Sequence, residues 1–297
     1  MGLIRVGTCA WNDHEHFYPP GLKAGDRLAY YARHFNLVEV DSTYYHLQPR
    51  RNFEKWARVT PDDFVFNVKA HRSMTLHERP RPSEETLLDT FAVFREALQP
   101  LAEAGKLKAL HFQFPPWFVR SREHMDYLRW VRDRLPDATI SVEFRHRSWF
   151  RGPEETAETL HLLKGLNYVH TICDEPQIGS GSVPPVVEAT HPGLAILRLH
   201  GRNAQTWYRR TQTSGERFDY LYTQEELAAW VPPLEALAER VDEVHVLFNN
   251  NRADYAVRGA RMMQQLLHLT PAAEEEPTPP WQNLDLFSPS ESPGGHR

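Results

Sequence analysis

The sequence predicts a (β/α)8 TIM barrel as a single domain, followed by a flexible C-terminal tail. Eight short apolar runs with the period of a strand recur along the chain, and stretches with the period of a helix separate most of them. The alternation occupies about 270 of the 297 residues, which matches the usual size of this barrel. An open doubly wound sheet would show the same alternation, and spacing alone does not exclude it.

The predicted strands are runs in which every second residue is apolar. In chain order they are Leu3–Cys9, Leu37–Asp41, Phe64–Lys69, Leu107–Phe114, Thr139–Arg145, Asn167–Cys173, Leu194–His200 and Val244–Asn249. A barrel places such strands side by side, with a helix after most of them.

Helices are predicted where apolar residues recur every three or four positions. They are Gly25–Phe35, Ser83–Glu103, Arg122–Leu135, Pro153–Leu163, Gln224–Arg240 and Tyr255–Leu267. Ser83 suits a helix start, and Thr223 suits an N-cap because acidic residues follow it in the first turn. Pro232 and Pro233 predict a kink in the helix after the seventh strand. The segment Asp174–Pro192 is rich in glycine and proline, so we predict a loop there instead of a helix.

The chain divides into a barrel domain, residues 1–269, and a tail, residues 270–297. The tail holds Glu274-Glu275-Glu276, six prolines and a Gly-Gly pair. A segment of this composition cannot bury enough apolar surface to fold alone, so we expect it to be flexible.

Composition excludes several classes of protein. With 34 basic and 39 acidic residues the net charge is −5, so an anion or nucleic-acid site must be a local patch. No run approaches the ~20 apolar residues of a membrane span, and the N-terminus shows no signal peptide. Cys9 and Cys173 lie inside predicted strands, which indicates buried free thiols. We therefore expect a cytoplasmic protein.

The strands carry polar residues at the positions that a barrel points inward. In the second strand, Val38 and Val40 alternate with Glu39 and Asp41. Because an unpaired buried charge costs several kcal/mol at least, the inward groups must pair with one another or line a wet pocket. The polar positions expected to point inward are Glu39, Asp41, Asn67, Lys69, His111, Gln113, Ser141, Glu143, Arg145, Arg198, His200, His245 and Asn249.

This fold places its chemistry at the C-terminal ends of the strands. Glu39, Glu143 and Arg198 are expected one layer below that mouth. A lattice of internal salt bridges without any ligand is the alternative, but such a lattice rarely stabilises more than apolar packing does. The last inward residues, at the mouth itself, are Asp41, Lys69, Gln113, Arg145, His200 and Asn249.

The loops after the strands add aromatic and basic residues. The segment Gly201–Tyr222 after the seventh strand contains Trp207, Tyr208, Arg209 and Arg210, and connections this long are usually functional or mobile. Aromatic rings beside arginines suit stacking on a base or sugar and pairing with phosphate, whereas an ordinary charged surface loop is the alternative. The earlier loops contribute Trp11, Tyr44, Tyr45, His71, His77 and Trp117.

Seven motifs in order span nearly the whole predicted barrel. They are Gly7-Thr8-Cys9-Ala10-Trp11, Val38-Glu39-Val40-Asp41-Ser42-Thr43-Tyr44-Tyr45, Phe64-Val65-Phe66-Asn67-Val68-Lys69, Phe112-Gln113-Phe114-Pro115-Pro116, Val142-Glu143-Phe144-Arg145-His146-Arg147-Ser148-Trp149-Phe150, Arg198-Leu199-His200-Gly201 and Phe248-Asn249-Asn250. Together they resemble the YecE-like family, the domain of unknown function seventy-two. The resemblance implies a TIM barrel, and it brings no established reaction.

The first functional hypothesis is an enzyme that acts on a phosphate-bearing or polyhydroxylated ligand. Hydrolysis of a phosphodiester, as in nucleic acid, and proton abstraction next to a carbonyl both fit, so a hydrolase and an isomerase stay open. The groups expected to transfer protons are Asp41, Glu143, Asp174 and His200. Among the binding residues, Lys69, Arg145 and Arg198 would hold an anion or a developing charge. The full set expected to bind the ligand is Trp11, Glu39, Tyr45, Lys69, Gln113, Arg145, Arg198, Tyr208 and Asn249.

We favour a site without a metal, with a bound catalytic metal as the alternative, and we expect no nucleotide cofactor. Histidine and carboxylate side chains are available at the mouth, but Lys69 and Arg145 there would repel a cation. No P-loop or GxGxxG motif follows a predicted strand.

The second hypothesis is a nucleic-acid-associated binding protein. The tail segment Gln282-Asn283-Leu284-Asp285-Leu286-Phe287 is similar to the Gln-Leu-Asp-Leu-Phe peptide by which many bacterial replication and repair proteins bind the sliding clamp. One extra residue separates the glutamine from the Leu-Asp-Leu-Phe run. Gln282, Leu284, Leu286 and Phe287 are therefore expected to contact that partner, as short recognition peptides do. Docking of these apolar residues on their own barrel is the alternative.

Overall fold

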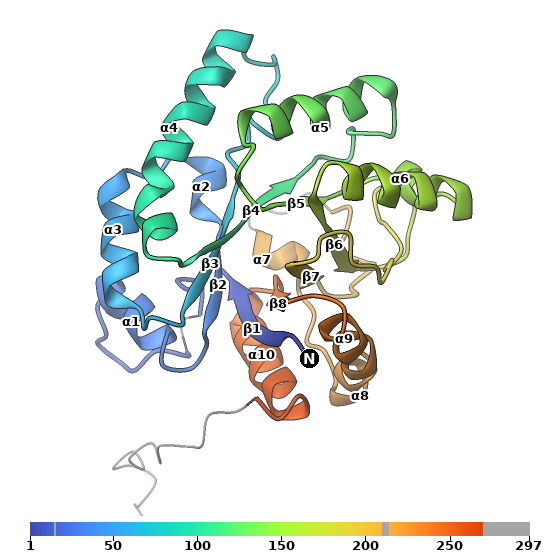
Figure 1. Ribbon diagram of the computed structural model, residues 1–297. Helices are drawn as coiled ribbons and strands as arrows, with labels where there is room; N and C mark the ends of the chain where they lie inside the picture. Colours follow the sequence, from blue (N-terminus) through green and yellow to red (C-terminus); the bar gives the residue numbers. More distant parts are fainter. Residues whose placement is uncertain (15, 210–213, 270–297) are drawn as a thin grey trace, which may run out of the picture.

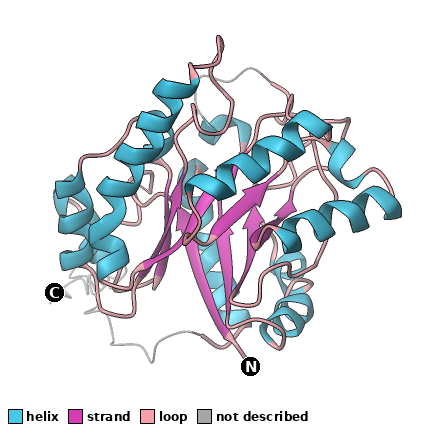
Figure 2. Ribbon diagram, turned by 45° about the horizontal axis from the view of Figure 1, so that its top comes forward, coloured by secondary structure: helices cyan, strands magenta, loops and turns pink. Residues whose placement is uncertain are grey.

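Eight parallel strands form a closed barrel in chain order, which confirms the predicted fold class (Figure 1). The computed structural model describes residues 1–14, 16–209 and 214–269. The first strand, β1 (Leu3–Cys9), closes the barrel by pairing in parallel with the last, β8 (Glu243–Phe248). Helices surround the strands (Figure 2).

The six strands between them follow the predicted order and lie within two residues of the predicted bounds. This agreement arises because the alternation of inward and outward side chains stops where the strand stops. They are β2 (Leu37–Val40), β3 (Val65–Lys69), β4 (Leu107–Gln113), β5 (Ile140–Glu143), β6 (Tyr168–Asp174) and β7 (Leu194–Leu199).

The longest helices occupy the predicted positions. Ser83 caps α4 and Thr223 caps α8, where it forms a capping box with Glu226. Among the described residues, no helix is long and apolar enough to cross a membrane. The α-helices are α1 (Arg27–Tyr31), α2 (Ser42–Tyr45), α3 (Arg50–Val59), α4 (Glu84–Glu103), α5 (Arg122–Arg134), α6 (Pro153–Gly165), α7 (Ser214–Arg217), α8 (Gln224–Ala228), α9 (Val231–Ala238) and α10 (Tyr255–Leu266). Short 3-10 helices are Ala24–Asp26, Arg147–Phe150 and Arg252–Asp254.

Two helical predictions need correction. The predicted helix Gln224–Arg240 is two helices, because Pro232 and Pro233 occupy the first turn of α9, where proline is tolerated. The helix α3 was not predicted, although its apolar residues Phe53, Trp56 and Ala57 recur at helical spacing and pack against the core. The predicted loop between β6 and β7 is confirmed, as residues 175–193 contain no helix.

The interior of the barrel is part apolar and part polar. The apolar interior cluster consists of Cys9, Leu37, Val65, Ala109, Val169, Leu194, Ile196 and Leu247. A larger apolar core lies between the outer faces of the strands and the helices, and it contains Val38 and Val40. The predicted alternation is therefore present, and both cysteines are buried free thiols as expected.

A polar cluster occupies the N-terminal end of the barrel. Glu243 accepts hydrogen bonds from Arg5 at 2.9 Å and Lys108 at 2.6 Å, and it lies 3.2 Å from His245. Asn67 Nδ2 lies 3.1 Å from the other ring nitrogen of His245. These contacts pair the charged groups at this end, where the fold normally serves stability.

Candidate functional site

Arg198 forms the centre of a buried ion-pair lattice near the end of β7. Its Nη1 donates to Glu143 Oε2 at 2.6 Å, and its Nη2 donates to Glu39 Oε1 at 2.5 Å. The three side chains have no exposed surface. Burial alone would disfavour ionisation of Glu39, but the charge of Arg198 holds its pKa at about 2. Glu39 is therefore an ionised partner of Arg198 at neutral pH.

Arg145 extends the lattice toward the mouth. Its Nε lies 2.6 Å from Glu143 Oε1, and its Nη1 donates to Glu175 Oε2 at 2.8 Å. Although burial opposes ionisation, the charges of Arg145 and Arg198 hold the pKa of Glu143 well below its usual range. A carboxylate held between two guanidinium groups is a poor proton acceptor at neutral pH. The geometry thus makes Glu143 a positioning residue for both arginines.

His200, the residue after β7, is buried against this lattice. Its Nε2 lies 3.4 Å from Glu143 Oε2, and its Nδ1 lies 2.9 Å from Asn249 Nδ2. Burial and the charge of Arg145 lower the pKa of the ring to about 3. Trp207 is also buried, with its ring centre 6.3 Å from that of His200. A neutral and covered imidazole is poorly placed for the proton shuttle that the sequence predicts.

Asp41 and Lys69 form a second pair, at the end of β2 and the end of β3. Lys69 Nζ lies 3.7 Å from Asp41 Oδ1, and the two side chains are 12% and 21% exposed respectively. Burial raises the pKa of Asp41 to about 6, while Lys69 lowers it and the charge of Glu39 raises it further. Asp41 is therefore a partly accessible carboxyl group that is populated in both protonation states near neutral pH.

A row of aromatic rings leads away from Lys69 along the rim. Lys69 Nζ lies 5.0 Å from the centre of the Tyr44 ring, and Tyr44 contacts the edge of His77 at 5.1 Å. The ring of His77 in turn meets that of Trp117 at 5.9 Å. Burial and the charges of Lys69 and Arg145 lower the pKa of His77 to about 4, so this histidine is neutral and lies near the mouth. The sequence placed His77 and Trp117 in loops but assigned neither of them to the site.

Asp174, predicted to transfer protons, is engaged elsewhere. It accepts hydrogen bonds from Arg202, Tyr222 and Trp230, at distances between 2.6 and 3.0 Å. Its neighbour Cys173 has its sulfur near Glu143, and successive residues of a strand point to opposite faces. Asp174 therefore holds two segments against the outside of the barrel. The segment after β7 is held through Arg202 and Tyr222, and the start of α9 is held through Trp230.

The remaining predicted binding residues differ in their surroundings. Trp11 belongs to the apolar core and packs edge-on against Trp56 at 5.1 Å, so it contributes stability. Tyr45 and Tyr208 are 52% and 55% exposed, and Gln113 is half-buried at the end of β4. Tyr208 is fixed by its hydroxyl group, which donates to Ile178 O at 2.7 Å.

Two predicted features lie wholly or partly outside the described residues. Arg210 of the predicted arginine and aromatic segment is among the residues that are not described, as is the whole tail. The predicted partner-binding residues belong to that tail, and they are Gln282, Leu284, Leu286 and Phe287.

Glu143, Cys173 and His200 are the one group of three metal-ligand types that converge within the described ranges, with ligand atoms within 4.8 Å. Their chemistry does not fit a cation. Glu143 already holds two guanidinium groups, and burial raises the pKa of Cys173 well above its usual value, so that sulfur stays protonated. A metal would need a thiolate or free carboxylate there.

Comparison with known proteins shows where similar chains occur. The family model described as "Protein of unknown function DUF72" matches residues 5–283. The UPF0759 protein YunF of Bacillus subtilis is 40% identical over 291 residues, covering 96% of this chain and all of that protein. The UPF0759 protein YecE of Escherichia coli K12 is 28% identical over 171 residues, covering 56% of this chain and 58% of that protein.

Two solved structures share the architecture. A DUF72 family protein of Enterococcus faecalis V583 is 30% identical with a TM-score of 0.83, over 91% of this chain and 97% of that chain. A DUF72 family protein of Thermotoga maritima MSB8 is 32% identical with a TM-score of 0.77, over 90% of this chain and 99% of that chain.

Proposed function

The chain belongs to the DUF72 family, whose function is unknown, and we propose that it is an acid–base enzyme acting on a small phosphate-bearing or polyhydroxylated ligand at the C-terminal mouth of its barrel. The observation that carries the proposal is the Asp41–Lys69 pair, in which two opposite charges meet at 3.7 Å and both stay partly exposed. The ends of parallel barrel strands are where this fold carries its chemistry.

Asp41 is the proton-transferring group of the proposed enzyme. Its pKa of about 6 places it near the operating pH, where a carboxyl group exchanges protons most effectively. Lys69 supplies a positive charge for an anionic group of the ligand or for a developing oxyanion. The proposed reaction therefore needs no other titrating group at the mouth.

The buried lattice supports the pair without entering the chemistry. Arg145 and Arg198 direct their guanidinium groups at Glu39, Glu143 and Glu175, so they have little donor capacity left for a ligand. Of the three cations predicted to hold an anion, Lys69, Arg145 and Arg198, we therefore assign this role to Lys69 alone. One carboxyl group and one ammonium group suit proton abstraction next to a carbonyl better than they suit hydrolysis of a phosphodiester, which develops more negative charge.

The test is exchange of substrate protons with solvent. The protein is incubated in D2O with a panel of sugar phosphates and hydroxyketones, and loss of the proton next to the carbonyl is followed by NMR. We expect exchange with wild type, and a rate lower by about 10²- to 10⁴-fold in Asp41→Asn. Asp126→Asn is the matched control, because Asp126 is an exposed carboxylate on α5, paired with Arg129.

Full exchange activity in Asp41→Asn would refute the proposed role of Asp41. If no member of the panel exchanges protons but bis(p-nitrophenyl) phosphate is cleaved in a reaction that depends on Asp41, the protein is a hydrolase that uses the same residues. Absence of both reactions would refute the enzyme proposal.

A second candidate function rests on the sequence of the tail. We propose that Gln282-Asn283-Leu284-Asp285-Leu286-Phe287 binds the sliding clamp and recruits the barrel to nucleic acid. Deletion of residues 272–297 should abolish binding to purified clamp in a surface-plasmon assay and leave the free energy of unfolding unchanged. Lower stability of the deletion variant with no clamp binding by the intact chain would show docking on the barrel instead.

A further inference from the structure

We propose that Trp117 and Arg79 form a subsite for a ligand that joins a flat ring to an anionic group, which is the chemistry of a mononucleotide. The subsite lies on the rim of the barrel mouth, between the loops that follow β3 and β4. The inference goes beyond the proposed function, because it concerns binding on the rim and assigns no reaction to the nucleotide.

Trp117 presents an exposed indole in a fixed orientation. The residue is 43% exposed. Its Nε1 donates to Leu76 O at 3.1 Å, and its ring makes a T-shaped contact with the ring of His77. An exposed aromatic ring that is already oriented loses little entropy when another ring stacks on it.

Arg79 supplies a positive charge over one face of this ring. Its guanidinium carbon lies 4.4 Å from the centre of the indole, and the residue is exposed. Within the described part of the chain, no carboxylate forms an ion pair with Arg79. Its planar donors are therefore available to an anionic group attached to a stacked ring.

The rim connects this subsite to the acid–base pair. Tyr44 and His77 stand between Lys69 and Trp117, and each ring contacts the next. The strip consists of three aromatic rings, with the cation Lys69 at one end and the cation Arg79 at the other. Rings combined with cations are typical of sites for nucleotides, in which bases stack and phosphates pair with cations.

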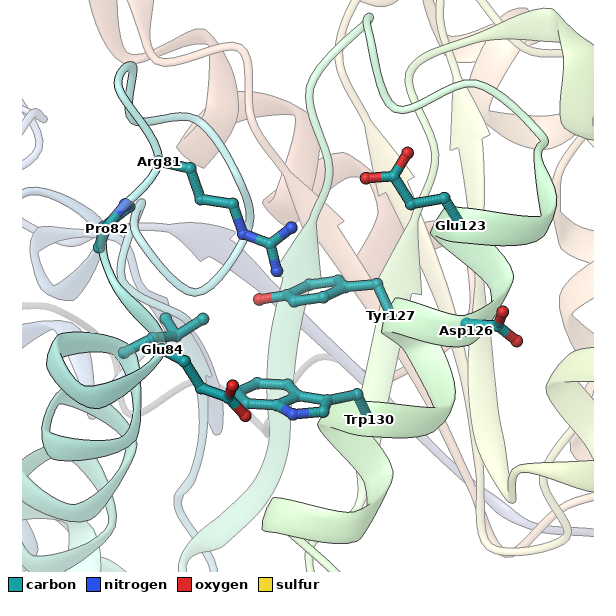
Figure 3. A pocket seen from close by; sticks show the side chains of 8 residues that line it. Arg81, Pro82, Glu84, Glu123, Asp126, Tyr127 and Trp130 are labelled. Atoms are coloured by element: carbon teal, nitrogen blue, oxygen red, sulfur yellow. The ribbon is translucent and has the colours of Figure 1, made fainter.

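A second arginine stacked on an aromatic ring provides a contrast. Arg81 lies over the ring of Tyr127 at 5.1 Å, in a groove of about 470 Å³ between α4 and α5 (Figure 3). The same groove is lined by Glu84, Glu123 and Asp126, whose charges oppose binding of an anion. Tyr127 is buried beneath it, so it offers no free ring. Arg81 therefore serves as the matched control for Arg79.

The test is equilibrium binding by calorimetry with adenosine 5′-monophosphate, adenosine and ribose 5-phosphate as probes. We expect wild type to bind the nucleotide at least about fivefold tighter than ribose 5-phosphate, since stacking of one base is worth that much or more. Trp117→Ala should abolish this preference, whereas Trp117→Phe, which also loses the hydrogen bond to Leu76, should keep most of it. Arg79→Met should weaken binding of the nucleotide and leave that of adenosine unchanged, and Arg81→Met should change neither.

The inference is overturned if wild type shows no preference for the nucleotide, or if Trp117→Ala retains it. It is also overturned if Arg81→Met and Arg79→Met have equal effects. A trinucleotide that binds tighter than the mononucleotide identifies a nucleic-acid strand as the source of this chemistry, and weaker binding identifies a free nucleotide. Loss of nucleotide preference in Trp117→Ala combined with unchanged turnover in Asp41→Asn would retain the subsite and refute the proposed reaction.

Discussion

At the scale of single residues, two carboxyl groups on one strand have opposite protonation behaviour. Glu39 lies on β2, and Asp41 directly follows the last residue of that strand. Because the two residues are two positions apart, both side chains point to the inside of the barrel. Arg198 donates to Glu39 at 2.5 Å, whereas the nearest ammonium group lies 3.7 Å from Asp41. The pKa is about 2 for Glu39 and about 6 for Asp41. Environment thus separates a structural carboxylate from one that can exchange protons.

Glu143→Gln is expected to destabilise the protein strongly. The substitution leaves Arg145 and Arg198 buried with one charged partner fewer each, which typically costs about 3–5 kcal/mol. The free energy of unfolding, measured with urea, should fall accordingly. Asp41→Asn should leave it unchanged or raise it, because the folded protein disfavours the ionised form of Asp41.

Glu123→Gln is the control for this pair of variants, since Glu123 is exposed on α5. Equal stability of Glu143→Gln and Glu123→Gln would contradict the central role of the lattice. A large loss of stability in Asp41→Asn would show that Asp41 is a structural residue and weaken its assignment as the proton-transferring group.

At the scale of elements, the strands that position the site were easier to predict than the helices. Inward polar and outward apolar residues alternate throughout β5 and over the last three residues of β2, and such alternation is visible in the sequence. The helix α3 was missed although Phe53, Trp56 and Ala57 recur at helical spacing, since most of its other residues are charged or polar. The break between α8 and α9 lies just before Pro232 and Pro233, where the sequence predicted a kink. The contact that fixes this break in space, from Trp230 Nε1 to Asp174 at 2.7 Å, joins distant segments and is not visible in local periodicity.

At the scale of the whole molecule, burial of neutral histidines governs the response to acid. His14, His170 and His200 are each almost completely buried, and burial lowers their pKa values to about 4, 4 and 3. Below pH 6.5 the unfolded chain binds protons at these positions and the folded chain does not, so stability is lost as the pH falls. Asp41 and Glu175, with raised pKa values of about 6 and 7, act in the opposite direction but are fewer.

His77, whose pKa is also lowered to about 4, adds to this loss, so the free energy of unfolding is expected to fall by roughly 2–4 kcal/mol between pH 7 and pH 5. Urea titrations at several pH values within this window measure it. His170→Asn should reduce the dependence of the free energy of unfolding on pH, because it removes one buried histidine with a lowered pKa. This variant leaves the ion-pair lattice intact, since His170 contacts a backbone carbonyl and no member of the lattice. Stability that stays constant or rises from pH 7 to pH 5 would contradict this account.

The sequence by itself determined the order and approximate bounds of the strands and which of their side chains point inward, and it favoured a barrel over an open sheet. These follow from periodicity, a local property that each strand carries whatever its neighbours are. Only the tertiary structure decided which inward charges pair. Arg198 meets Glu39 and Glu143 across 159 and 55 positions of sequence, and both acids are thereby removed from proton chemistry. Asp41 remains a candidate acid for two reasons. Its cationic partner, Lys69, lies farther away at 3.7 Å, and part of the Asp41 side chain is exposed at the mouth. Both properties depend on how the closed barrel places these residues in space.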